Sequence, residues 1–141
     1  MISVRSNRPV TLISITVWVH AAVVAMHAAA HVGSGIWMAV PATVYIWLVI
    51  IIGPIAGWWL MRSERAVLGS SIVAACMTGA LVFGGINHFV WAGIDHVSTI
   101  PPGVWRIPFQ ATAILLALTE AGGVVVGIMG IGAFFPDRRR S

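Results

Sequence analysis

The sequence predicts an all-α integral membrane protein, a four-helix transmembrane bundle made of two antiparallel hairpins. Three observations predict this fold class. Of the 141 residues, 59% are hydrophobic and 9% are charged, whereas a soluble domain carries roughly 25% charged residues. The apolar residues fall into four long segments, each with at least the roughly 20 residues that a helix needs to cross a bilayer core. The basic residues lie mainly at the ends of these segments, which is typical of membrane-spanning chains.

The four predicted spans follow one another with short connections. They cover about residues 10–32, 36–61, 66–93 and 107–135. Helix is the expected state of each span, because a backbone that faces lipid must satisfy its own hydrogen bonds. The short connections place the first two spans in one antiparallel hairpin and the last two in another. We therefore expect the whole chain, residues 1–141, to form a single transmembrane domain.

The eight basic residues are all arginines, and seven of them agree with one topology. These seven precede the first span, separate the second from the third, or follow the fourth: Arg5, Arg8, Arg62, Arg65, Arg138, Arg139 and Arg140. The positive-inside rule then places both termini in the cytoplasm of a bacterial or archaeal cell. Arginines spread over chain ends and loops do not form a nucleic-acid patch, so the expected partner is the lipid bilayer rather than a nucleic acid.

Polar residues gather near the predicted extracytoplasmic ends of the first and third spans. His27 and His31 end the first span one helical turn apart, so they share one helix face. His88 ends the third span, and Asp95 and His96 follow it in the longest loop. An ionisable group at bilayer depth costs about 2.5–3.5 kcal/mol, so such groups usually face the bundle interior and often have a function. We expect these side chains to lie close together.

One interpretation of this group is a haem b site. Two histidines from different helices at the same depth can act as axial ligands, and His27 or His31 opposite His88 meets that condition. Arg106, predicted on the same side of the membrane, is then a partner for the haem propionates. Without haem, Arg106 is a candidate partner for the carboxylate of Asp95.

A second interpretation is a transition-metal site. His27, His31, His88 and His96 offer imidazole nitrogens and Asp95 offers carboxylate oxygens, which suit copper, zinc or iron. A third interpretation needs no cofactor: the histidines form hydrogen bonds between helices and hold the bundle together. The clustering of four histidines at one level favours a bound metal or haem over this structural role.

A second polar pair is predicted near the middle of the membrane. His20 lies near the centre of the first span and Glu120 near the centre of the fourth. If these two helices are neighbours, the side chains can meet and relay protons, or bind a cation or a quinone. The other interpretation is a structural hydrogen bond between the two helices, and the sequence favours it.

The sequence therefore predicts a small four-span membrane protein that binds haem b or a transition metal, in electron transfer or metal handling. It would act by itself, as a homo-oligomer, or as a subunit of a larger membrane complex. The alternative is a non-catalytic accessory subunit or a small-solute transporter whose histidines are structural. The chain has no nucleotide-binding motif, no Ser-His-Asp pattern and no CxxCH haem attachment. An enzyme acting on a lipid or a quinone is a third class, and only the pair of His20 and Glu120 supports it.

Overall fold

The computed structural model describes residues 8–135, and these residues contain helices and no strand. The elements in chain order are α1 (Arg8–Ser34), α2 (Val40–Tyr45), the π-helix η1 (Ile46–Ile52), α3 (Gly53–Met61), α4 (Ala66–Gly85), the π-helix η2 (Ile86–Val90) and α5 (Arg106–Phe134). They join into four helical segments that are long and apolar enough to cross a membrane. The prediction of four such helices is therefore confirmed.

The observed segments differ from the predicted spans mainly at the second and third helices. The second segment begins at Val40 rather than near residue 36, and the third ends at Val90 rather than near residue 93. Residues 36–39 are not helical, because Gly35, with a φ of +68°, ends α1 in the left-handed conformation common after a helix. The predicted cytoplasmic residues Arg5, Arg138, Arg139 and Arg140 lie outside the described residues.

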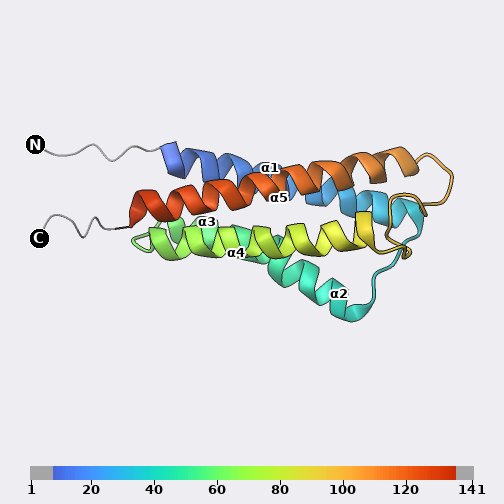
Figure 1. Ribbon diagram of the computed structural model, residues 1–141, viewed down its shortest axis with the longest axis horizontal. Coiled ribbons are helices and arrows are strands. Elements are labelled where there is room, and N and C mark those ends of the chain that lie inside the picture. Colours follow the sequence, from blue (N-terminus) through green and yellow to red (C-terminus); the bar gives the residue numbers. More distant parts are fainter. Residues whose placement is uncertain (1–7, 136–141) are drawn as a thin grey trace, which may run out of the picture.

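Helix α5 lies at the centre of the packing. It packs against both α1 and α4, and α4 packs in turn against α3. In Figure 1 the start of α1, the α3–α4 turn and the end of α5 lie at one end of the bundle. The connections 35–39 and 91–105 lie at the opposite end, which is called the distal end below.

Two glycines allow the helices to approach closely. A Cβ atom on Gly69 of α4 would collide with the backbone of Gly57 and Met61 in α3. A Cβ atom on Gly127 of α5 would lie 2.8 Å from the backbone nitrogen of Ala74 in α4. Small residues at helix contacts are the usual packing device inside membranes, where apolar burial between helices gives little driving force.

Large apolar side chains are exposed along the helices, and several polar side chains are buried together with apolar ones. Large apolar side chains that are more than half exposed occur along every long helix, including Trp18, Trp47, Leu48, Trp59, Leu118 and Ile128. The buried polar and charged side chains are His20, His27, Ser70, His88, Asp95, Thr112 and Glu120. The exposed apolar side chains on four long helices are compatible with contact with lipid.

Candidate functional site

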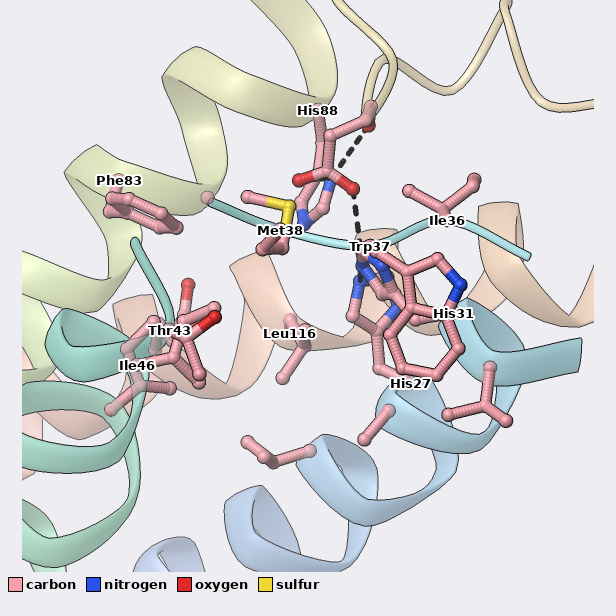
Figure 2. Close-up of a pocket in the computed structure, with 17 residues that line it drawn as sticks. His27, His31, Ile36, Trp37, Met38, Thr43, Ile46, Phe83, His88 and Leu116 are labelled. Carbon is pink, nitrogen blue, oxygen red and sulfur yellow. Dashed lines mark hydrogen bonds and ion pairs between the residues drawn. The ribbon is translucent and has the colours of Figure 1, made fainter. Parts of the chain in front are cut away.

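Three histidines and one aspartate meet at the distal end of the bundle (Figure 2). His31 Nε2 lies 3.2 Å from His27 Nε2 and 3.1 Å from Asp95 Oδ1. His88 Nδ1 lies 2.9 Å from the main-chain carbonyl oxygen of Asp95 and 3.4 Å from its Oδ2. These four residues are called the histidine–aspartate cluster below.

Local backbone structure brings His88 and Asp95 together. Helix α4 continues into the π-helix η2, in which the Trp91 amide donates to the Ile86 carbonyl five residues earlier, at 2.7 Å. Such wide turns are frequent at functional sites. The following loop folds back, because the Val97 amide donates to the His88 carbonyl at 3.0 Å. This second bond holds Asp95 over the end of the helix that carries His88.

The hydrogen bonds fix which ring nitrogen carries the proton in two of the histidines. The Thr112 hydroxyl donates to the Pro108 carbonyl at 2.7 Å, so its oxygen accepts a hydrogen bond from His27 Nδ1, 2.8 Å away. His88 Nδ1 faces the carbonyl of Asp95, which can only accept. Both rings therefore carry their proton on Nδ1, an assignment from the hydrogen-bond network. Their Nε2 atoms are therefore acceptors; that of His27 lies 3.2 Å from His31 Nε2, and that of His88 has no hydrogen bond to a described residue.

The cluster contains more acceptors than donors. His31 Nε2 faces two acceptors, the Nε2 lone pair of His27 and the Asp95 carboxylate, and it has one proton at most to share between them. Within residues 8–135, Asp95 Oδ1 and His31 Nδ1 are buried atoms without a hydrogen bond of good geometry. Buried polar atoms without a hydrogen bond are costly, so the cluster has unused acceptor capacity that a cation could satisfy.

The rings of the cluster are in direct contact. The ring centroids of His27 and His88 are 4.8 Å apart, and the two planes are nearly perpendicular, at 78°. Phe109 from α5 packs against three imidazoles, with centroid distances of 4.7 Å to His27, 4.8 Å to His31 and 5.7 Å to His88. The histidine rings therefore enclose no flat space between them.

A cavity of about 230 Å³ lies beside the cluster. The cluster residues and Glu120 line its polar part, and its apolar walls include Trp37, Met38, Ile46, Phe83 and Leu116 (Figure 2). No lysine or arginine lines this cavity within the described part of the chain. Asp95 and Glu120 are therefore the acidic groups of its lining, and the three histidines are the basic ones.

Two predicted site residues lie outside the cluster. The side chain of His96 turns to its own loop, with Nδ1 2.7 Å from Ser98 Oγ. Arg106 begins α5, and in the region that the structure describes the ion pairs join Asp95 to His31 and His88 rather than to this arginine. The expected pair of Arg106 with Asp95 is therefore not formed.

His20 and Glu120 are both buried, but the structure does not bring them together as a pair. His20 Nε2 lies 3.1 Å from the Ile50 carbonyl, and its Nδ1 lies 3.4 Å from the Thr119 hydroxyl. That carbonyl is available because Pro54, four residues later, has no N–H to offer it. Glu120 lines the cavity beside the cluster instead.

Reasoning from the sequence missed two roles: that of Pro54, which leaves the Ile50 carbonyl for His20, and that of Thr112, which accepts from His27. Pro54 carried a usable signal, because a proline inside a helix predicts a free carbonyl four residues earlier that needs a donor. The role of Thr112 carried no such signal, since a threonine inside a helix usually bonds to its own helix.

Comparisons with known proteins do not place this chain. No family model matches the sequence, and neither the curated proteins nor the solved structures give a match. Within residues 8–135, no group of three or more histidine, cysteine, aspartate or glutamate side chains has the arrangement of a preformed metal site. The chemistry of the cluster therefore has to be argued from its own contacts.

Proposed function

We propose that this chain is a small membrane protein that binds one transition-metal ion in the histidine–aspartate cluster, in metal handling or electron transfer. The observation that carries the proposal is the orientation of His27 and His88. Each ring donates its Nδ1–H to a fixed acceptor, Thr112 or the Asp95 carbonyl, so its Nε2 lone pair is directed away from that acceptor and can bind a metal. Metal-binding histidines almost always have this second hydrogen bond, which fixes the tautomer and the ring.

The distances within the cluster are compatible with a common ion. Nitrogen and oxygen ligands of zinc lie about 2.0–2.2 Å from the metal, so neighbouring ligand atoms of a tetrahedral site are roughly 3.3 Å apart. His27 Nε2 and His31 Nε2 are 3.2 Å apart, and His31 Nε2 and Asp95 Oδ1 are 3.1 Å apart. Because the cluster is not preformed, binding requires some side chains to turn, His88 among them. The metal would supply the positive charge that this acceptor-rich group lacks.

The same contacts favour a metal ion over haem b. A haem with two axial histidines needs a flat layer between the two rings. The rings of His27 and His88 touch instead, and Phe109 packs against both of them. Copper, zinc and iron all accept nitrogen and carboxylate ligands, so the geometry leaves the choice among these three metals open.

The proposal includes a membrane orientation. Exposed apolar side chains on all long helices support insertion as two antiparallel hairpins. Arg62 and Arg65 lie in the turn between α3 and α4, at the end of the bundle away from the cluster (Figure 1). By the positive-inside rule that end, with both termini, is cytoplasmic. The cluster then lies near the extracytoplasmic face.

The experiment is to purify the full chain in detergent, titrate it with Zn²⁺ or Cu²⁺ and measure metal content and the absorption spectrum. We expect the unchanged protein to bind one ion per chain and the variant His27→Ala to bind it much more weakly. His96→Ala is the matched control, because it removes a histidine outside the cluster, and it should bind normally. A Soret band in the absorption spectrum would indicate bound haem, and the proposed metal site would then be wrong. A folded protein that binds neither metal nor haem would overturn both.

A further inference from the structure

Glu120 is a buried carboxylate without a protein partner. Only 2% of its surface is exposed, and among residues 8–135 no hydrogen bond or ion pair involves its side chain. It lines the same cavity as the histidine–aspartate cluster. An ionisable group at this depth usually has a function, because leaving it unpaired is costly. A cation that enters the cavity would supply the missing partner.

His88 faces the same part of the cavity as Glu120. A Cβ atom on Gly84 would lie 3.7 Å from Glu120 Oε2 and also 3.7 Å from His88 Cδ2, the ring carbon bonded to Nε2. The missing side chain of Gly84 thus leaves open space that the carboxylate and the free side of the imidazole ring share. Nε2 of that ring carries a free lone pair, since Nδ1 donates to the Asp95 carbonyl.

The cavity has room for a hydrated cation beside its polar side chains, while most of its wall is apolar. Its volume is about 230 Å³, and a water molecule occupies about 30 Å³ in the liquid, so there is room for an ion with several waters. Its lining contains two carboxylates, of Asp95 and Glu120, and no lysine or arginine within the described residues. The cavity runs without interruption from the cluster to Glu120.

We propose that Glu120 and His88 form an inner binding site for the same metal ion, deeper in the bundle than the outer site, in which His27, His31 and Asp95 bind the ion together with His88. The inference rests on the proposed function and adds a path along which the ion can move, from the outer site towards Glu120. His88 belongs to both sites, so an ion can move between them by exchanging ligands without leaving the protein. Two divalent ions this close in an apolar bundle repel each other strongly. One ion therefore occupies one site at a time.

The test removes the outer site and asks whether binding persists. The variant His31→Ala/Asp95→Asn lacks two outer ligands but keeps His88 and Glu120. In Zn²⁺ titrations of the full chain, we expect it still to bind one ion, with a lower affinity than the unchanged protein. Adding Glu120→Gln should abolish this remaining binding. Adding Glu64→Gln instead is the matched control, because it removes an exposed carboxylate in the α3–α4 turn, and binding should stay.

The outcomes separate the two proposals. If the unchanged protein binds Zn²⁺ but His31→Ala/Asp95→Asn does not, the inner site is wrong and the proposed function stands. The inner site is also wrong if Glu120→Gln leaves the remaining binding unchanged. If the unchanged protein binds no Zn²⁺, the proposed function itself fails. Should the double variant not elute as a folded helical protein, His31→Ala alone, with and without Glu120→Gln, provides the same comparison.

Discussion

His20 and His27 lie on the same helix, seven residues apart, and both are buried. Their hydrogen bonds differ. His20 gives its Nε2–H to the Ile50 carbonyl, which can only accept, and its other nitrogen lies near Thr119. His27 uses Nδ1 to bond Thr112 and keeps Nε2 as a lone pair towards the cluster. The role of a buried histidine thus depends on the bonding capacity that its neighbours leave free rather than on its depth.

The largest effect is expected from His88→Ala. This change removes a free Nε2 lone pair and also the donor that holds the Asp95 carbonyl. Metal affinity should therefore fall by more than the roughly 10–100-fold that follows loss of a supporting residue alone. Calorimetric titration with Zn²⁺ measures the change. An affinity close to that of the unchanged protein would mean that His88 belongs with His20, as a structural histidine.

A smaller effect is expected from Thr112→Val, which preserves side-chain shape but removes the hydroxyl that accepts from His27 Nδ1. Without this acceptor the ring and its tautomer are no longer fixed, so metal affinity should fall by about 10–100-fold. Thr78→Val is the control, because the Thr78 hydroxyl bonds only within its own helix, to Ala74. Equal affinities for the two threonine variants would contradict the orienting role of Thr112.

His20→Ala should affect stability and leave metal affinity unchanged. It leaves the buried Ile50 carbonyl without its donor, which costs about 1–3 kcal/mol of unfolding free energy. Pro54→Ala restores a backbone N–H that can reach this carbonyl, so the double change His20→Ala/Pro54→Ala should be less damaging than the sum of the two single changes. Reversible unfolding in mixed micelles measures the unfolding free energies of the unchanged protein, the two single variants and the double variant. Strict additivity would refute the link between proline and histidine.

The smallest effect is expected from His96→Ala. Its ring bonds to Ser98 in the loop, away from the cluster, so unfolding free energy should change by no more than about 0.5 kcal/mol. Metal affinity should also stay the same. A marked loss of metal in this variant would show that the loop rearranges on binding and brings His96 to the ion.

The sequence was sufficient to predict the helical segments and the meeting of His27, His31, His88 and Asp95 at one end. Segment length, apolar composition and depth along each helix carry that information. The sequence did not determine which neighbours each helical side chain faces, or in which direction each loop side chain points. Adjacent helical residues are turned by about 100°, so at one depth Thr119 reaches His20 while the next residue faces the cavity.

The same limit explains the two residues that did not join the cluster. His96 directly follows Asp95, but neighbouring loop residues point in different directions, and only the hydrogen bonds of the folded loop determine which one faces inward. Arg106 shares the level of the cluster without an ion pair to Asp95. A shared depth therefore predicted which residues can meet, while their actual contacts required the structure.

In the proposed site His27 and His88 present Nε2 lone pairs that a metal can bind, whereas His20 uses its Nε2–H for the Ile50 carbonyl. Nitrogen NMR of the protein labelled with ¹⁵N at histidine tests this claim directly, with assignments from single histidine variants. We predict Nδ1–H tautomers for His27 and His88, with Nε2 signals that shift on addition of Zn²⁺, and an Nε2–H tautomer for His20 that does not respond. Nε2–H tautomers at His27 and His88, with signals unchanged by Zn²⁺, would contradict the account.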